Sequence, residues 1–314
     1  MITLHRYSQD HKQMWDNFVE ESKNGTFLHL RDYMDYHSDR FHDFSIMVWN
    51  DNKLLALLPA CSLGDVWVSH AGLTYGGMLM NGKMTAALAL EVFQTLLPNL
   101  RYRGFNQIRY SPSPHIYHRL PAEEDLYALF RCGASLSARK ISSVVESAHP
   151  LKWRNIRKAG VRKAISEGIT IERSDNFVDF WEILSDNLAN KYSAQPVHSL
   201  EEIVRLHDLF PDKILLYSAN KGGKMLAGVV MYVMPTVAHC QYISANPEGK
   251  EVGALDLLFH HLLKEVYTDL PYFDFGTSNE DGGLYLNESL IYQKEGFGGR
   301  AICYDTYTLP LVYP

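Results

Sequence analysis

The segment YISANPEGKEVGA, residues 242–254, decides how the rest of the chain is interpreted. It begins as a strand, passes through a short loop with proline and glycine, and ends where a largely apolar helical stretch starts. Free backbone N–H groups and the helix dipole make the start of such a helix a natural anion site. Lys250 adds a positive charge there, and Gly249 and Gly253 permit close backbone approach. The alternative is an ordinary strand-to-helix turn whose two glutamates complement the dipole.

The elements around this segment occur twice along the chain. In the second half, two strands joined by an Asn/Gly turn are followed by a further strand, a helix and a last strand, at 214–217, 226–233, 241–244, 251–267 and 272–276. In the first half a similar order is found, with a strand pair, a helix and a strand at 46–49, 54–58, 83–97 and 105–110. We therefore predict a duplicated α/β protein with mixed sheets and flanking helices, divided into domains 1–148 and 149–314.

Composition places the chain among globular proteins. Its 314 residues are 46% hydrophobic and 21% charged, which excludes disordered, collagen-like and coiled-coil proteins. A net charge of −6 gives no overall attraction to nucleic acid. The four cysteines form no C-x-x-C pair, as is typical of reduced thiols, and the sequence predicts neither a signal peptide nor a transmembrane helix. We expect a cytoplasmic protein that does not insert into membranes.

A basic segment, KWRNIRKAGVRK at residues 152–163, lies between the two repeats. Six of its twelve residues are basic and none is acidic. Arg154, Lys158 and Arg162 recur every four residues, so they lie on one face of a helix. This stripe is either a solvated helix face or a ridge that meets phosphate groups. Further on, the capping box from Ser199 to Glu202 predicts the start of another helix.

A polar, glycine-rich segment follows the strand at 272–276 and runs to residue 299. Such loops between apolar strands often line clefts, although the glycines also suit plain turns. Within it, Lys294 is suited to bind a phosphate or carboxylate or to stabilise a developing oxyanion, and a solvated surface lysine is the alternative. The chain has no nucleophile elbow, P-loop or H-E-x-x-H motif, and its histidines form no metal-binding set, so we expect no metal.

Taken together, these residues resemble the Gcn5-related N-acetyltransferase (GNAT) superfamily, in its tandem-domain Fem-like branch. The matching segments are RNIRKA (154–159), PVHS (196–199), GKEVGAL (249–255), DFG (274–276), LN (286–287) and KEGFGG (294–299). The resemblance implies two tandem GNAT-like acyltransferase domains, of which the first is a degenerate copy and the second carries the donor site. It also implies transfer of an acyl group to an amine.

The same resemblance assigns expected roles to individual residues. Lys294 would lie near the reacting carbonyl or a substrate phosphate, and Asp274 is the candidate base that removes the amine proton. The donor would face Ser244, Ala245, Asn246, Gly249, Lys250, Val252, Gly253 and Ala254. The substrate would contact Arg154, Arg157, Lys158, His198 and Asn287. The acetyl-CoA loop of GNAT enzymes usually reads Gln/Arg-x-x-Gly-x-Gly/Ala, whereas this chain has Lys250, Gly253 and Leu255 at those positions.

We therefore predict an N-acyltransferase that uses acyl-CoA, such as acetyl-CoA. Its acceptor would be an amino group on a small molecule, a sugar nucleotide or a cell-wall precursor. One alternative is a Fem-like aminoacyltransferase that uses aminoacyl-tRNA to modify a peptidoglycan precursor, for which the basic stripe is the supporting feature. Another is a non-catalytic ligand-binding protein.

Overall fold

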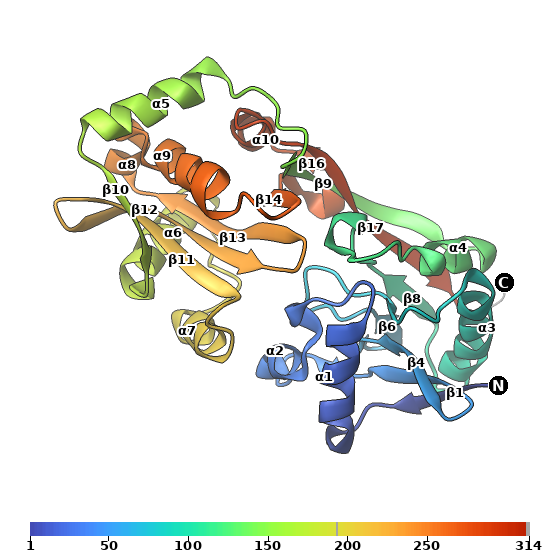
Figure 1. The fold of residues 1–314 in the computed structure, drawn as a ribbon. Coiled ribbons are helices and arrows are strands. Elements are labelled where there is room, and N and C mark those ends of the chain that lie inside the picture. Colours follow the sequence, from blue (N-terminus) through green and yellow to red (C-terminus); the bar gives the residue numbers. More distant parts are fainter. Residues whose placement is uncertain (193, 312–314) are drawn as a thin grey trace. The chain divides into compact units, whose positions relative to one another are not determined.

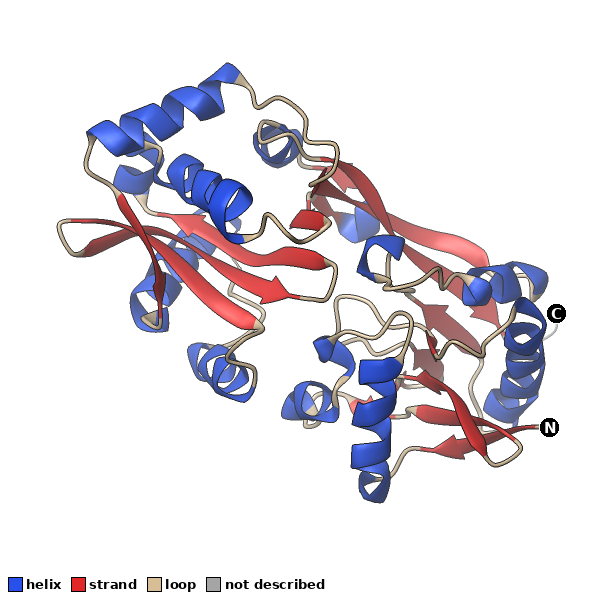
Figure 2. Cartoon of the chain, in the orientation of Figure 1, coloured by secondary structure: helices blue, strands red, loops and turns tan. Residues whose placement is uncertain are grey.

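The computed structural model describes residues 1–192 and 194–311, and the chain folds into two compact units (Figure 1). Residues 1–141, 279–285 and those from 303 on form the first unit, and residues 142–278 and 286–302 form the second. Strands β9 (Ser135–Glu146) and β17 (Arg300–Pro310) each contribute residues to both units. Helices and strands alternate through both units, which confirms the predicted α/β class (Figure 2).

The first unit contains two runs of paired strands. One has the order β1-β3-β4-β7, with β1 (Ile2–Arg6), β3 (Ile46–Asn50), β4 (Lys53–Leu58) and β7 (Leu79–Met80). The other has the order β9-β17-β8-β6-β5-β2, with β8 (Gln107–Tyr110), β6 (Val66–Val68), β5 (Cys61–Leu63) and β2 (His42–Asp43). The helices are α1 (Lys12–Glu21), α2 (Arg31–Met34), α3 (Ala86–Tyr102) and α4 (Glu124–Arg131). The predicted strand pair, helix and strand of this half are all present.

The second unit is built on one mixed sheet. Its strand order is β10-β11-β12-β13-β14-β9, with β10 (Thr170–Ser174), β11 (Ile214–Lys221), β12 (Lys224–Val233), β13 (Val237–Ala245) and β14 (Tyr272–Thr277). The helices are α5 (Asn155–Ser166), α6 (Phe177–Tyr192), α7 (Leu200–Leu209), α8 (Pro247–Val252), α9 (Ala254–His261) and α10 (Glu288–Glu295), and a π-helical turn (Leu262–Val266) follows α9. Along the chain, two short strands come between β14 and α10. They are β15 (Asn279–Glu280), which belongs to the first unit, and β16 (Tyr285–Leu286), at which the chain returns to the second unit.

Helices cover both faces of this sheet. On one face, the side chains of Leu258, Phe259 and Leu262 pack with alternate residues of β11 and β12 in a single buried core. On the other face, α6 approaches β12 so closely that a Cβ on Gly228 would lie 2.4 Å from the Phe180 ring. Alternate strand residues therefore face opposite helices, as the two-residue period of a strand requires.

The break between α8 and α9 divides the helical stretch that the sequence predicts at 251–267. Gly253 has a φ of +77°, in the left-handed region that glycine adopts without strain, and it ends α8 at Val252. The chain then starts again as α9 in a new direction. The predicted capping box is confirmed, because the Ser199 hydroxyl accepts a hydrogen bond from the Glu202 backbone and the Glu202 side chain accepts one from the Ser199 backbone.

Candidate active site

The two central strands of the second unit pair briefly and then separate. β13 and β14 run parallel, but their register covers only 237–239 against 272–274. β13 continues to Ala245 paired with β12 alone, after an irregularity that leaves Gln241 as an extra residue in its strand. One extra residue in a strand bends it and increases its local twist, and such bulges are common beside functional sites. Beyond residue 239, the edge of β13 that faces β14 therefore has no strand pairing with β14.

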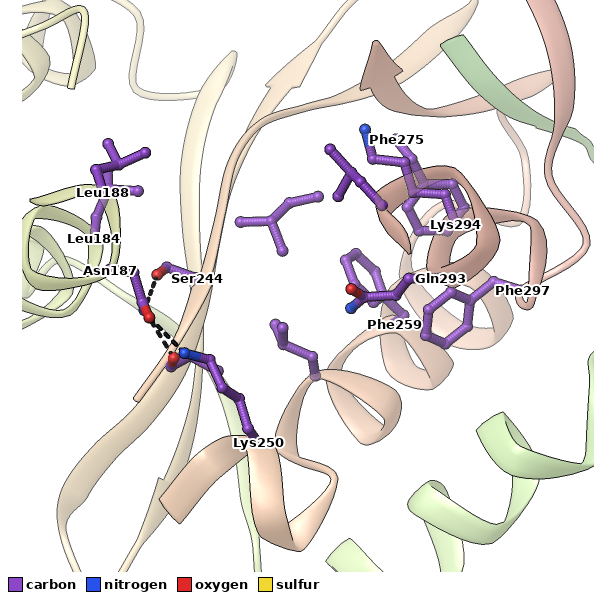
Figure 3. A pocket seen from close by; sticks show the side chains of 14 residues that line it. Leu184, Asn187, Leu188, Ser244, Lys250, Phe259, Phe275, Gln293, Lys294 and Phe297 are labelled. Atoms are coloured by element: carbon purple, nitrogen blue, oxygen red, sulfur yellow. Dashed lines mark hydrogen bonds between the residues drawn. The ribbon is translucent and has the colours of Figure 1, made fainter. Parts of the chain in front are cut away.

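A cavity of about 260 Å³ lies where the strands separate (Figure 3). Its walls come from α6, the end of β13, α8, α9, β14, α10 and the turn after α10. Eight of the lining side chains are leucine, isoleucine or phenylalanine: Leu184, Leu188, Ile243, Leu255, Phe259, Phe275, Leu290 and Phe297. The other lining residues are Asn187, Ser244, Ala245, Lys250, Gln293 and Lys294. An apolar cavity with a few polar groups is the usual form of a small-molecule site.

Lys294 is the buried cation of this cavity. Its side chain comes from α10 and is only 5% exposed. The Nζ atom donates hydrogen bonds to the carbonyl oxygens of Gly276 and Thr277, each at 2.8 Å. Burial lowers the pKa of Lys294 to about 8, against a partial upward effect of the nearby Asp274 carboxylate. An ammonium group that uses two of its three N–H donors in this way has one left for a ligand.

Asp274 supports the turn that holds Lys294. Its carboxylate accepts hydrogen bonds from Gly276 N at 2.8 Å and from the Ser142 hydroxyl, and it lies 3.1 Å from His239 Nδ1. The register of β14 against β9 gains one residue between Asp274 and Thr277, so a bulge turns the strand end toward α10. Asp274 is completely buried and does not line the cavity, whereas its neighbour Phe275 does.

A polar cluster occupies the opposite side of the cavity (Figure 3). Asn187 Nδ2 donates to Ser244 Oγ at 2.7 Å and to the Ala245 carbonyl at 2.8 Å. Asn187 Oδ1 accepts a hydrogen bond from Lys250 Nζ. This cluster ties α6 and α8 to the end of β13, so it fixes the width of the cavity at that side.

The structure brings together four of the residues predicted from the sequence, namely Lys294, Ser244, Ala245 and Lys250. The others lie outside the lining. Asn246 caps α8 by accepting a hydrogen bond from Gly249 N at 2.8 Å, and Val252, Gly253 and Ala254 form the junction of α8 and α9. Asn287 caps α10 in the same way, through Leu290 N at 3.1 Å. The predicted donor and substrate roles of these residues stay predictions.

The predicted substrate-binding arginines hold α5 in place. Arg154 lies over the Tyr292 ring at 3.8 Å and 3.4 Å from Glu295, and Arg157 pairs with Asp256 at 2.8 Å. Lys158 is exposed on the outer side of α5. His198 is buried, and its Nδ1 atom lies 2.5 Å from the Tyr242 hydroxyl oxygen. Burial raises the pKa of Tyr242 to about 12.

Sequence reasoning missed the part of the site that α6 contributes. Leu184, Asn187 and Leu188 line the cavity, yet they precede the predicted donor loop by more than fifty residues. A signal was present, because apolar residues recur at helical spacing at 177, 180, 181, 184 and 188. Asn187 lies beside that apolar face, where an amide is uncommon.

Comparison with known proteins found one family model that covers most of the cavity lining, although Leu290, Gln293, Lys294 and Phe297 lie beyond it. Residues 152–282 match the family model described as Acetyltransferase (GNAT) domain. This segment, less than half of the chain, is similar to a GNAT domain. This segment includes the whole run from α5 to β15, and therefore the separated strands and the α8–α9 junction. No curated protein sequence matches the chain significantly.

Solved structures extend the likeness to the whole chain. The crystal structure of FemX has a TM-score of 0.68 at 10% identity, over 98% of this chain and 97% of that one. L-PGS from Bacillus licheniformis has a TM-score of 0.63 at 14% identity, over 99% and 94%. A tandem GNAT protein from the clavulanic acid biosynthesis pathway has a TM-score of 0.54 at 10% identity, over 100% of both chains. These structures show that the chain has the fold of FemX and of the tandem GNAT protein, as predicted.

Two further observations concern cofactors and membranes. Within residues 1–192 and 194–311, no three His, Cys, Asp or Glu side chains are grouped so that they could hold a metal ion. No helix in the same ranges is long and apolar enough to cross a bilayer.

Proposed function

We propose that the protein is an N-acyltransferase that acts in the cavity between β13 and β14. The observation that carries this proposal is Lys294, a buried ammonium at the wall of an apolar cavity that is lined largely by the segment similar to a GNAT domain, residues 152–282. In acyl transfer, negative charge develops on the carbonyl oxygen of the donor. A preorganised cation in a dry site stabilises that charge much more strongly than water does.

The reaction follows from this arrangement. The acceptor amine nitrogen attacks the carbonyl carbon of an acyl thioester, and the carbonyl oxygen becomes an oxyanion beside the free N–H of Lys294. The carbon–sulfur bond then breaks, the thiolate leaves, and it takes up the proton released by the amine to become the free thiol. The products are an amide and a free thiol. Much of the rate comes from holding the two reactants in line.

An acyl thioester is the donor that we favour, and the cavity supports this choice by its apolar walls. The acceptor is an amino group of a small molecule, a sugar nucleotide or a cell-wall precursor. The first test measures thiol release from acetyl-CoA with a panel of such amines. Lys294→Met should lower kcat/KM about 100- to 1,000-fold. The exposed Lys213→Met serves as the control and should not change it. An equal rate in Lys294→Met and the wild type would refute the proposal.

A second candidate is Fem-like transfer from aminoacyl-tRNA to a peptidoglycan precursor. It is favoured by the cations on the outer side of α5, where Lys158, Arg162 and Lys163 are exposed and no acidic residue occurs within the helix. Binding through these residues would weaken steeply with salt, because each phosphate contact releases counterions. Salt-dependent binding of tRNA and consumption of aminoacyl-tRNA, with no thiol release from any thioester, would select this candidate. Ligand binding without turnover of any donor would select a binding protein.

A further inference from the structure

Helix α5 lies directly on the start of α9. A Cβ on Gly253, the residue before α9, would lie 2.6 Å from the Gly160 carbonyl oxygen of α5. A Cβ on Gly160 would lie 1.8 Å from a carboxylate oxygen of Asp256. Both glycines therefore serve the close approach of the two helices, and the gap between them has no room even for a methyl group. The start of α9 is covered on this side by the protein itself.

The anion at this helix start also belongs to the protein. Asp256 lies in the first turn of α9, where the helix dipole favours a negative charge. Its carboxylate pairs with Arg157 at 2.8 Å, and both side chains are less than one-fifth exposed. A second anion, such as a diphosphate, would have to approach this carboxylate or displace it. Like charges at such distances repel strongly in a partly buried setting.

The same helix also covers α10. Arg154 stacks on the Tyr292 ring, and its guanidinium donates to the Tyr292 carbonyl oxygen at 3.3 Å. Arg154 also lies 3.4 Å from Glu295. The two arginines at the start of α5 thus bind the two helices that border the cavity on this side. These cations are engaged with acidic and aromatic partners of the same unit.

The cavity itself is mainly apolar. Its polar lining consists of Asn187, Ser244 and Lys250 on one side and Gln293 and Lys294 on the other. Lys250 Nζ already donates to Asn187 Oδ1, and Lys294 Nζ already donates to the carbonyl oxygens of Gly276 and Thr277. Leu255 lines the cavity at the position where the acetyl-CoA loop usually has a glycine or alanine. A leucine here fills space close to the first turn of α9. The polar groups can meet amide groups of a donor, whereas a diphosphate finds a covered helix start.

We propose that the donor is an acyl thioester recognised through its acyl group and pantetheine arm, with little contribution from the nucleotide of coenzyme A. This inference rests on the proposed function, because it names the donor class for the same cavity. The shared chemistry is the acyl-pantetheine thioester. Its source is either coenzyme A or the prosthetic arm of an acyl carrier protein.

The test compares three donors of the same acetyl group on the full-length protein: acetyl-CoA, acetyl-pantetheine and acetyl-acyl carrier protein. We expect kcat/KM for acetyl-pantetheine to lie within about threefold of that for acetyl-CoA. A tenfold difference would correspond to about 1.4 kcal/mol of recognition by the nucleotide, and we expect the nucleotide to contribute less than that. A preference of 100-fold or more for acetyl-CoA over acetyl-pantetheine would overturn the inference. A clear preference for the carrier protein would support it and identify the source.

A second measurement uses the nucleotide part alone. Adenosine 3′,5′-bisphosphate carries the phosphates without the arm, and we expect no competition with acetyl-pantetheine at millimolar concentrations. Competition at micromolar concentrations would contradict the inference. If no thioester is consumed in the presence of any amine, the proposed function fails instead, so the two failures are distinguishable.

The Asp256→Asn variant tests the role assigned to the carboxylate. Removal of its charge leaves Arg157 without its ionic partner, so acetyl-CoA should gain at least threefold over acetyl-pantetheine relative to the wild-type ratio. The matched control is Asp212→Asn, which changes an exposed acid of the same unit and should leave the ratio unchanged. Because both donors are measured on one protein preparation, partial loss of folded protein cancels in the ratio. An unchanged ratio in Asp256→Asn would contradict the inference.

Discussion

The Lys294 ammonium on α10 donates a hydrogen bond to the carbonyl oxygen of Gly276 at the end of β14, at 2.8 Å. Gly276 has a φ of +77°, and its own N–H donates to the Asp274 carboxylate at 2.8 Å. The three residues form a chain of contacts in which a buried carboxylate shapes the turn and the turn holds the cation. The position of this charge at the cavity therefore depends on a strand end as well as on the helix.

Burial of Lys294 should make stability depend on pH in the alkaline range. The folded pKa is about 8, below the ordinary value of 10.5, so between these values the unfolded chain binds more protons than the folded chain. Stability then rises with pH from about 8 to 10.5, by about 3 kcal/mol for this group. Below pH 8 the contribution is constant and unfavourable. The free energy of unfolding, measured with urea at pH 7 and pH 10, should rise in the wild type and should not rise in this way in Lys294→Met. An identical rise in the wild type and in Lys294→Met would contradict the assignment.

The Asp274→Asn variant should distinguish a positioning residue from a base. We expect kcat to fall about 10- to 100-fold with little change in KM. Loss of the carboxylate charge also removes an upward effect on the pKa of Lys294, so the alkaline limb of the pH–rate profile should move to lower pH. If Asp274 were the base, the acid limb would disappear from the profile in addition to this shift, whereas a positioning residue leaves the acid limb in place. The pH profile of kcat/KM measures both limbs.

Much of the second unit could be predicted because its signals are local. The strands at 214–217, 226–233 and 272–276 are apolar runs bounded by turn residues, and the capping box at Ser199 marks a helix start within four residues. The helix at 83–97 was predicted to end before Pro98, but α3 continues to Tyr102. Pro98 is exposed, and its missing N–H removes one helical hydrogen bond without ending α3.

The site depends on contacts that the sequence does not show. Arg157 belongs to the basic segment at 152–163, yet its partner Asp256 lies 99 residues away. Asn187 and Ser244 are 57 residues apart and meet only because α6 crosses the end of β13. Local patterns specify helices and strands, whereas these pairs depend on how the sheet is covered. Lys294 could be singled out by its residue type and loop, but its two carbonyl partners could not.

The Asn187→Ala variant should weaken the polar side of the cavity. It removes the donor to Ser244 Oγ and the Ala245 carbonyl, and the acceptor for Lys250 Nζ. Unpaired groups left in a partly buried site typically cost 1–3 kcal/mol, so the unfolding midpoint should fall and KM for the donor should rise about tenfold. Asn176→Ala, which changes an exposed asparagine before α6, is the control for KM. Equal donor KM values in the two variants would show that this cluster does not contact the donor.

Acid should destabilise the first unit through its buried histidines. Burial lowers the pKa of His29 to about 4 and that of His70 to about 3, from an ordinary value of 6.5. Both histidines are neutral in the folded unit at neutral pH. As the pH falls from 6.5 toward 4, the unfolded chain binds protons that the folded unit does not, so the free energy of unfolding decreases. Above pH 6.5 this loss is absent. The fluorescence of the buried Trp15 and Trp67 should report unfolding at lower urea concentration at pH 5 than at pH 7.

His29→Gln removes one titrating group and should reduce this pH dependence, measured as the difference between the two midpoints. His149→Gln, an exposed residue, should leave it unchanged. A pH dependence that is the same in His29→Gln and the wild type would show that His29 is not the group that couples protonation to unfolding.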